Sequence, residues 1–373
     1  MVLFFELLKR LHFIDFTRSL AIILMLQGHF IDLTLDINSV SNDNSLYNGW
    51  LGIRGLTAPL FFFVSGLIFC YVFLIAESKN KGSERLKKGY FRGVKLLFLG
   101  YLLQTNFKDL PLYFSGEINP WVYGFHVLQC IGMCILILNS IFLIHHLLKR
   151  RTNSLVLVSI GFISFLLYTW LNQTYFNTYF PQNAHPIVQN MFKGQYSMFS
   201  LLKFLPFILF GAALGNFLFN NLTENRFQLF RKLFIIAGLS YFAPWLLLKC
   251  IDLTYFFPET EWVLDAGILA RTGQAIGVIA IMLLAEPYLM RYLKSWIDIG
   301  QYTLPIYFIH VVMLYGGIIG FGIKSFWNKN LTPWESILGA LGFIALFYSL
   351  SKLIALYYSK WHTKLLTRPS QNN

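Results

Sequence analysis

The chain has 373 residues, of which 56% are hydrophobic and only 13% are charged, and its mean hydropathy is +0.56. A soluble globular protein carries about 25% charged residues, so this composition excludes an ordinary soluble domain. Runs of about 20 apolar residues indicate membrane helices rather than a β-barrel. The net charge of +13 does not indicate nucleic-acid binding, because basic residues collect in the cytoplasmic loops of membrane proteins.

We expect an all-α, polytopic membrane protein in which residues 1–373 form a single integral-membrane domain. The helix core should cover about 13–358, and 359–373 should be a cytoplasmic tail. The apolar segments predict about ten transmembrane helices. They are 13–35, 55–77, 91–106, 120–148, 154–172, 200–220, 232–251, 263–285, 299–321 and 335–358.

Basic residues are divided unequally between alternate connections. The N-terminus and segments 78–95, 149–151, 221–232, 286–298 and 359–373 together hold 20 Lys and Arg, whereas 37–54, 107–119, 173–199, 252–262 and 322–334 hold 5. By the positive-inside rule, this division places both termini in the cytoplasm. The external segments 173–199 and 252–262 combine aromatic and amide side chains, which suit either covering helix ends or stacking on sugar rings.

The first apolar segment carries an unusual polar stripe. At about 100° per residue, its five ionisable residues fall within an arc of roughly 100°. Ionisable groups at membrane depth are costly, so the stripe should face protein or a water-filled cavity rather than lipid. An ion pair between Asp15 and Arg18 explains part of it. The full set is Asp15, Arg18, His29, Asp32 and Asp36.

His29 is the candidate catalytic residue, because a histidine can act as a general base near neutral pH. Asp32 lies one turn further along and could orient the imidazole. Arg18 lies eleven residues before His29, which places the two on one face and roughly 16 Å apart along the axis. Arg54, at the external mouth of the second helix, is either an ion-pair partner of Asp32 or Asp36 or a substrate-binding residue.

Segment 79–95 is expected to be a cytoplasmic loop with seven basic residues. Its charge either sets the topology or binds an anionic cytosolic cofactor, for which Lys87, Lys88 and Arg92 are candidates. The segment contains no phosphate-binding fingerprint.

Three later helices also carry polar residues, which are candidates for binding cofactor or substrate. Together they predict a central polar cavity. No zinc-binding or Ser-nucleophile motif occurs, so no metal site is expected. The polar pairs on these three later helices are His126 with Gln129, Arg271 with Gln274, and Gln301 with His310.

The ordered motifs resemble the transmembrane acyltransferase superfamily. The first helix has the pattern R-x4-D-x2-R-x10-H from Arg10 to His29, and the second begins RGLTAPLFFFVSGLIF. Later blocks that match are FHVLQCIGM, KFLPFILFGAALGNF, ARTGQAIG and IGQYTLPIYFIHVVMLYG. The branch it resembles most contains bacterial proteins similar to the catalytic domain of heparan-alpha-glucosaminide N-acetyltransferase, with acyltransferase family 3 as a sister group. That branch often has Gly after the helix-1 arginine, where this chain has Ser19.

The resemblance implies transfer of an acetyl (acyl) group from cytosolic acetyl-CoA to a sugar or cell-envelope glycan at the external face. It also implies a bacterial cytoplasmic (inner) membrane location, a catalytic role for His29 and a requirement for Arg18. Cofactor binding would involve Arg18, Asp15, Lys87, Lys88, Arg92, Arg271 and Gln274. Substrate binding would involve Arg54, His126, Gln129, Gln301 and His310.

Several alternatives stay open at the sequence level. A proton-coupled transporter or flippase could also use the ionisable residues, although no pair of broken helices is evident. A non-enzymatic membrane scaffold would not need so many buried polar groups. The acceptor, O- or N-acetylation, direct transfer or an acyl-histidine intermediate, and homo-oligomer formation are not determined.

Overall fold

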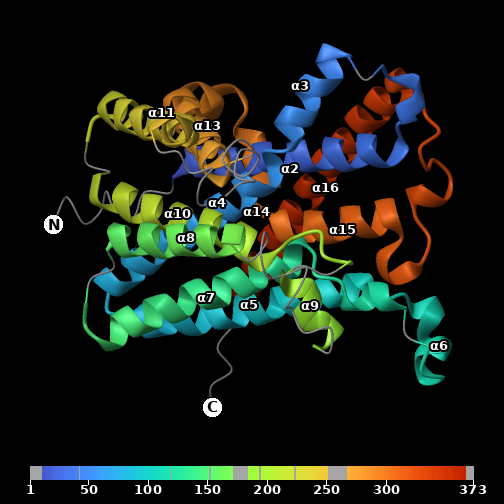
Figure 1. Cartoon of the computed structure of the whole chain (residues 1–373), viewed down its shortest axis with the longest axis horizontal. Coiled ribbons are helices and arrows are strands. Elements are labelled where there is room, and N and C mark those ends of the chain that lie inside the picture. Colours follow the sequence, from blue (N-terminus) through green and yellow to red (C-terminus); the bar gives the residue numbers. More distant parts are fainter. Residues whose placement is uncertain are drawn as a thin grey trace. The chain divides into compact units, whose positions relative to one another are not determined.

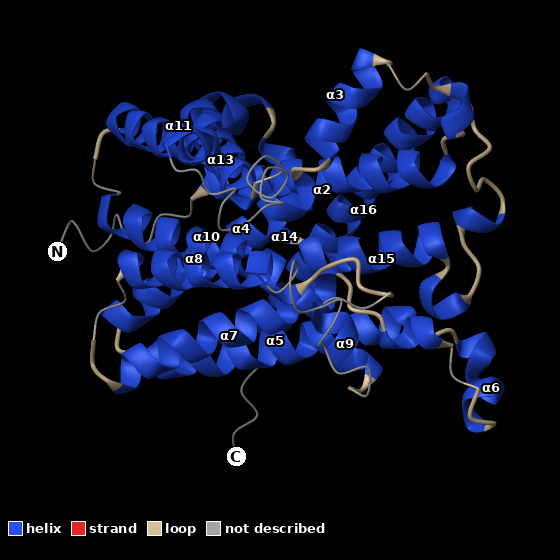
Figure 2. Cartoon of the chain, viewed as in Figure 1, coloured by secondary structure: helices blue, strands red, loops and turns tan. Residues whose placement is uncertain are grey.

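The computed structural model describes residues 11–41, 43–117, 119–150, 153–170, 184–192, 195–221, 224–250 and 267–366. Every regular element in these ranges is a helix, and none of them contains a strand (Figure 2). This confirms the all-α prediction. Arg10 and most of the two aromatic external segments lie outside the described residues.

Six helices of the described residues are long and apolar enough to cross a membrane. They are His12–Thr34, Ser45–Ser78, Val127–Leu147, Leu201–Asn221, Ile268–Tyr292 and Pro333–Tyr357. A bent pair, Lys294–Gln301 with Thr303–Tyr315, would make a seventh span. The protein is therefore a multi-pass membrane protein, and the total of about ten spans stays a prediction.

The chain divides into two compact units, whose helices are labelled in Figure 1. Unit 1 comprises residues 1–11 and 55–284, and unit 2 comprises 12–54 and 285–373. The long helices of unit 1 are α4 (Thr57–Ser78), α5 (Gly82–Gln104), α7 (Val127–Leu147), α8 (Ser154–Trp170), α10 (Leu201–Asn221), α11 (Arg226–Cys250) and most of α13 (Ile268–Tyr292). Its short helices are η2 (Phe107–Asp109), α6 (Leu110–Phe114), η3 (Pro120–Tyr123) and α9 (Pro186–Phe192).

Glycines let the helices of unit 1 pack closely. A Cβ atom at Gly66 of α4 would overlap the carbonyl oxygen of Ile208, and one at Gly211 of α10 would overlap that of Phe63. The α4 and α10 backbones therefore touch directly, as small residues allow in membrane helix pairs. Similarly, α5 lies along α7 (Figure 1), and a Cβ at Gly93 would lie 2.5 Å from Leu136 Cδ2.

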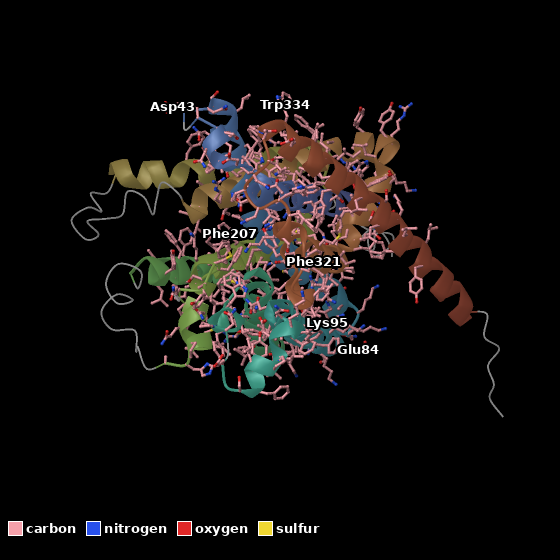
Figure 3. All side chains as sticks on the ribbon, turned by 90° about the vertical axis from the view of Figure 1, so that its right-hand side faces the viewer. Asp43, Glu84, Lys95, Phe207, Phe321 and Trp334 are labelled. Atoms are coloured by element: carbon pink, nitrogen blue, oxygen red, sulfur yellow. The ribbon has the colours of Figure 1, made fainter. Side chains whose placement is uncertain are left out.

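The predicted basic loop is largely helical, which corrects the boundary of the third span. Helix α5 begins at Gly82 rather than near residue 91, so Lys87, Lys88 and Arg92 lie on its first turns. Leu, Lys, Arg and Glu are all good helix formers, and Glu84 in the first turn complements the helix dipole. The glycine face packs on α7 and leaves the charged face exposed, where Figure 3 marks Glu84 and Lys95.

Unit 2 is arranged around α2 (His12–Thr34), which packs against α14 (Ile297–Gln301), α15 (Thr303–Tyr315) and α16 (Pro333–Leu366). Its remaining helices are η1 (Ile37–Ser39), α3 (Ser45–Arg54), η6 (Lys294–Trp296), η7 (Gly317–Ile319) and η8 (Ile323–Ser325).

The predicted span 299–321 is not one continuous helix. Helices α14 and α15 meet at Tyr302 with a bend of 72°. Pro305 explains the break, because it has no N–H for the carbonyl oxygen of Gln301 and its ring crowds the preceding turn. Helix α15 then ends at Tyr315, and Gly316 follows with φ +83°, a left-handed conformation that favours glycine.

Other expected boundaries also change. Segment 37–54, expected to be a loop, contains α3, whereas the span expected to begin at 120 forms η3 before α7 begins at Val127. Asp36 lies beyond the end of α2, so it is not part of the helical stripe. Its carboxylate instead accepts a hydrogen bond from Asn38 N at the start of η1.

The carboxyl end of α2 is closed by segment 329–331. Lys329 N donates to Leu33 O at 3.0 Å, and Leu331 N donates to Thr34 O at 2.9 Å. The Lys329 ammonium group also donates to the carbonyl oxygen of Asp32. These bonds satisfy carbonyl groups that have no partner within the helix, and the positive charge complements the helix dipole.

We expect Gly211→Ala to destabilise unit 1 by about 1–3 kcal/mol, because the added methyl group overpacks against backbone that cannot move aside. Thermal or denaturant unfolding in detergent would measure this change. Gly238→Ala in α11 is the matched control, since among the described residues no atom from outside the local helix backbone lies within 4 Å of the added Cβ. Equal stability of the two variants would contradict the close α4–α10 contact.

Candidate active site

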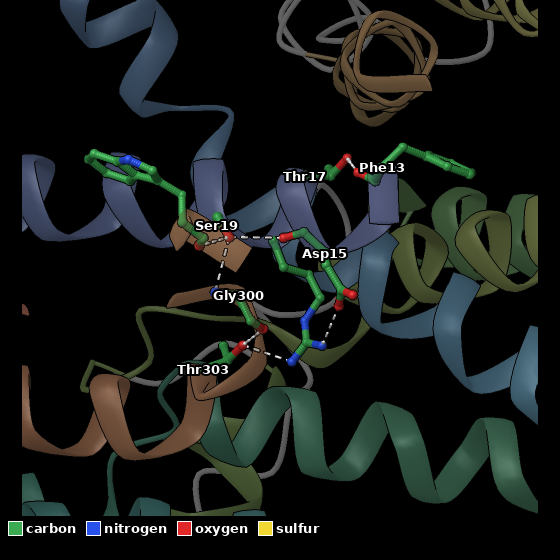
Figure 4. A network of polar contacts seen from close by, with 8 residues as sticks. Phe13, Asp15, Thr17, Ser19, Gly300 and Thr303 are labelled. Atoms are coloured by element: carbon green, nitrogen blue, oxygen red, sulfur yellow. Dashed lines mark hydrogen bonds and ion pairs between the residues drawn. The ribbon is translucent and has the colours of Figure 1, made fainter. Parts of the chain in front are cut away.

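The His12 end of α2 carries a polar network (Figure 4). Arg18 NH1 lies 3.7 Å from Asp15 Oδ1, and Arg18 NH2 donates to Thr303 Oγ1 at 2.8 Å. The Thr303 hydroxyl donates in turn to Gly300 O at 2.8 Å. Arg18 is therefore held by its neighbour on α2 and by the first residue of α15.

Ser19 joins α2 to α14. Its hydroxyl lies 2.8 Å from Trp296 O and 3.0 Å from Asp15 O, and it can donate to either carbonyl oxygen. The same hydroxyl accepts a hydrogen bond from Gly300 N at 3.0 Å. A Cβ atom at Gly300 would lie 2.7 Å from Ser19 Oγ and would overlap the carbonyl oxygen of Asp15. A glycine after the helix-1 arginine, as in the related branch, would allow close helix packing. In this chain the packing is also close, but the glycine that allows it is Gly300 of α14 rather than residue 19 of α2.

The Thr34 end of α2 brings two histidines together. The half-buried His29 ring lies 5.4 Å from the ring of His310 of α15, centroid to centroid. His29 Nδ1 lies 3.1 Å from the hydroxyl of Tyr315, the last residue of α15. The contact fixes one nitrogen of the imidazole and leaves Nε2 for a second partner. Two imidazole rings from α2 and α15 thus form the centre of the candidate site.

His310 is fully buried, and neither ring nitrogen has a hydrogen-bond partner of normal geometry among the described residues. The Tyr307 ring packs edge-on against His310, with centroids 4.9 Å apart. Buried polar atoms without partners cost about 1–3 kcal/mol each, so a ligand or water that bonds His310 would stabilise the site.

Asp32 pairs with cations rather than with His29. Its Oδ2 lies 2.9 Å from Arg54 NH2, and its Oδ1 lies 3.9 Å from Lys329 Nζ. Arg54 also stacks over Trp50, whose Nε1 donates to Gln27 Oε1 at 2.7 Å. The Asp32–Arg54 ion pair, one of the two alternatives in the sequence, is therefore present. The Nδ1 atom of His29 is bonded to the Tyr315 hydroxyl, and the orienting role expected for Asp32 stays a prediction.

Gln301 ends α14 at the break and is partly exposed. It follows Gly300, which bonds Ser19, and it precedes the bend that leads into α15. The break places Gln301 and His310 on two different helices rather than on one continuous span.

His126 and Gln129 belong to unit 1, at the start of α7. His126 is the extended residue before the helix, and Gln129 is only 1% exposed. His126 Nε2 and both amide atoms of Gln129 lack hydrogen-bond partners among the described residues. The predicted pair therefore exists as two adjoining polar side chains with unused hydrogen-bonding atoms.

Arg271 and Gln274 also belong to unit 1. The Arg271 NH1 group donates to Gln274 Oε1 at 3.0 Å, so the predicted i,i+3 pair is formed. Gly273 between them allows α13 to approach α11, because a Cβ there would lie 2.6 Å from Tyr241 N. Lys87, Lys88 and Arg92 are exposed on α5 of the same unit. The convergence of these groups with the histidines on one central cavity stays a prediction.

No group of three or more His, Cys, Asp or Glu suitable for a metal ion occurs within the described residues.

Sequence reasoning did not identify three contact residues of unit 2. Tyr315, Thr303 and Lys329 each bond a residue of the polar stripe from a distant part of the chain. Tyr315 could have been suspected, because a tyrosine directly before two glycines ends a helix at a fixed place. Thr303 and Lys329 carry no local signal, because their partners lie nearly 300 positions away.

A family model described as an acyltransferase domain matches residues 11–352, nearly the whole chain. The chain belongs to acyltransferase family 3. The protein is thus a membrane acyltransferase, and the superfamily indicated by the motifs is confirmed at this level. The narrower resemblance to heparan-alpha-glucosaminide N-acetyltransferase stays a prediction. A comparison with curated proteins gives no match.

We expect Thr303→Val to destabilise unit 2 of this acyltransferase by about 1.5–3 kcal/mol, because Arg18 loses a charge-assisted hydrogen bond. Thr303→Ser keeps the hydroxyl and is the matched control. Thermal unfolding of both purified variants would measure the difference. If the valine and serine variants unfold at the same temperature, the Arg18–Thr303 bond does not support the site.

Proposed function

We propose that this acyltransferase transfers an acetyl (acyl) group from cytosolic acyl-CoA to a sugar or cell-envelope glycan at the external face of the bacterial inner membrane. Both termini would lie in the cytoplasm, as the distribution of basic residues predicts. The observation that carries the proposal is the His29 imidazole, bonded through Nδ1 to Tyr315 and adjacent to His310. This is the arrangement that a positioned general base or nucleophile requires.

His29 can act in either of two ways. As a base, Nε2 takes the proton of an acceptor hydroxyl or amine while that atom attacks the thioester carbonyl, and the leaving CoA thiolate recovers the proton. As a nucleophile, Nε2 attacks the carbonyl itself, and the leaving CoA thiolate takes up the proton of Nδ1. The acceptor then attacks the acyl-imidazole, receives the acyl group from Nε2 and gives its own proton to the released imidazole. Both routes need Nδ1 held in a defined protonation state, which the Tyr315 hydroxyl can provide.

The donor would approach from the His12 end of α2. The charged head of CoA cannot cross a bilayer, whereas its slender pantetheine arm could extend from Arg18 toward His29, roughly 16 Å away along the helix. Asp15 and Thr303 hold the Arg18 guanidinium in place. The exposed Lys87, Lys88 and Arg92 on α5 offer further positive charge for the phosphates, with Arg271 and Gln274 as additional donor contacts.

The acceptor would bind toward the Thr34 end of α2. His310 supports this placement, because its buried nitrogens can bond a hydroxyl group of the acceptor. Arg54 and Asp32 form a charged pair beside the histidines, which supports a role for them in binding the polar acceptor. Gln301 at the helix break is the remaining candidate of unit 2.

We expect His29→Ala to lower acetyl transfer by about 10²–10⁴, the usual cost of losing a general base. The variant should still fold and still bind CoA. Transfer of radiolabelled acetyl from acetyl-CoA to envelope glycans, with CoA binding measured separately, would test the function directly. His310→Ala and His126→Ala are the comparison variants. Near-native turnover in folded His29→Ala protein, with an inactive His310→Ala variant, would show that the assignment is wrong.

We expect Tyr315→Phe to lower kcat by about tenfold with little change in KM for acetyl-CoA, because one hydrogen bond that positions His29 is lost. The pH dependence of kcat should also change, which loss of packing alone would not cause. Tyr348→Phe is the matched control, since it removes a hydroxyl bonded to Ser295 Oγ at 2.9 Å in the same unit. If the pH dependence of kcat were identical in the Tyr315→Phe and Tyr348→Phe variants, the positioning role of Tyr315 would be refuted.

A further inference from the structure

A second group of polar side chains with buried, unpartnered atoms lies in unit 1, where α5 ends and α7 begins. Gln129 is 1% exposed, yet neither its oxygen nor its nitrogen has a hydrogen-bond partner among the described residues. His126 Nε2 and Gln104 Oε1 are also buried atoms without a hydrogen-bond partner among the described residues. Buried polar groups are almost always bonded in native proteins, so four such atoms in one region indicate a missing polar partner.

The three side chains adjoin one another. Gln104 Nε2 donates to Gly124 O at 3.1 Å, and a Cβ at Gly124 would lie 3.0 Å from His126 Nε2. Gln129 follows His126 by one helical turn, and a Cβ at Gly100 of α5, one turn before Gln104, would lie 2.6 Å from Gln129 Cδ. We call Gln104, His126 and Gln129 the amide–histidine cluster.

The cluster is uncharged. Burial lowers the pKa of His126 to about 4, so its imidazole is neutral near pH 7. The two amides carry no charge, and within the described residues no ion pair involves any of the three side chains. A buried ion without a counter-charge is far more costly than a neutral polar group, so the cluster should reject ionic ligands.

We propose that the amide–histidine cluster is the subsite that binds an uncharged sugar ring of the acceptor through its hydroxyl or acetamido groups. This inference rests on the proposed glycan acceptor and deepens it by naming a neutral sugar as the group recognised. Gln104 and Gln129 provide both donors and acceptors, and a neutral imidazole provides one of each. Such mixed groups match sugar hydroxyls, which also donate and accept.

An aromatic side chain completes the subsite. The Trp121 ring packs on His126 with centroids 4.7 Å apart, and Tyr196 lies edge-on to Trp121 at 6.3 Å. Trp121 is nevertheless 43% exposed, so part of its face is open to a ligand. A flat aromatic face beside a few polar groups suits one face of a sugar ring. In the expected topology, this end of α5 and α7 lies on the external side.

The binding test uses the full-length protein in nanodiscs. Isothermal titration would compare methyl N-acetylglucosaminide, glucosamine in its ammonium form and glucuronate. We expect the neutral sugar to bind at least tenfold more tightly than either charged sugar, because only the charged ones must bury an unpaired ion. Equal affinities for all three sugars, or no binding of the neutral sugar, would overturn the proposal.

The variant test uses Gln129→Leu, which keeps a similar side-chain volume but has no amide. We expect the neutral sugar to bind about tenfold more weakly, while the melting temperature stays the same or rises because an unpaired buried amide has been removed. Asn139→Leu, at the other end of α7, is the matched control. Asn139 is fully buried, and although its Oδ1 has no partner among the described residues, its amide nitrogen bonds Leu86 O at 3.0 Å. Loss of this bond should lower stability and leave sugar affinity unchanged.

The KM values of Gln129→Leu show whether the cluster binds the sugar acceptor or the uncharged pantetheine arm of acetyl-CoA. A higher KM for the sugar with an unchanged KM for acetyl-CoA in Gln129→Leu would support the sugar assignment. A higher KM for acetyl-CoA alone would assign the cluster to the pantetheine arm and overturn the proposal. If the neutral sugar binds in a Gln129-dependent way but no acetyl transfer occurs, the proposed function fails while the subsite stands.

Discussion

The hydrogen bonds of the Ser19 hydroxyl hold α2 and α14 together, and the geometry of unit 2 depends on them. A hydroxyl group inside an apolar region must be fully bonded, and Ser19 achieves this by using backbone atoms of Asp15, Trp296 and Gly300. Only glycine at position 300 leaves space for the contact. Because α15 starts two residues after α14 ends, this contact fixes the point from which α15 runs along the polar face of α2.

The polar stripe of α2 is satisfied by residues that the bend brings to it. Arg18 bonds Thr303 at one end of α15, and His29 bonds Tyr315 at the other. Asp32 is neutralised from two further directions, by Arg54 at the end of α3 and by Lys329 before α16. The stripe thus consists of separate polar contacts along one helix, with partners from α15, from the end of α3 and from the segment before α16.

Local patterns in the sequence predicted the helices and the residues of α2, because amphipathic spacing and membrane length are local properties. The position of His29 on the polar face of α2 follows from this spacing, whereas the pairing of Arg54 with Asp32 is one of several alternatives and needs the structure. The break at Tyr302 was missed, although Pro305 is visible, because proline is tolerated in many membrane helices. The helical start of α5 is not evident from the sequence, because a run of basic residues is typical both of a cytoplasmic loop and of an exposed helix. Tyr315 and Thr303 could not be paired with the stripe, since pairing across the chain depends on the tertiary fold.

The two contacts of α15 have a mechanical consequence for α2. A 13-residue helix is roughly 20 Å long and stiff, and this one is attached to α2 at both of its ends. A movement of the Thr303 end, where Arg18 is held, must therefore shift or tilt the Tyr315 end, where His29 is held. While both bonds persist, Arg18 and His29 cannot move relative to α15 independently of each other, because α15 is a stiff helix bonded to both.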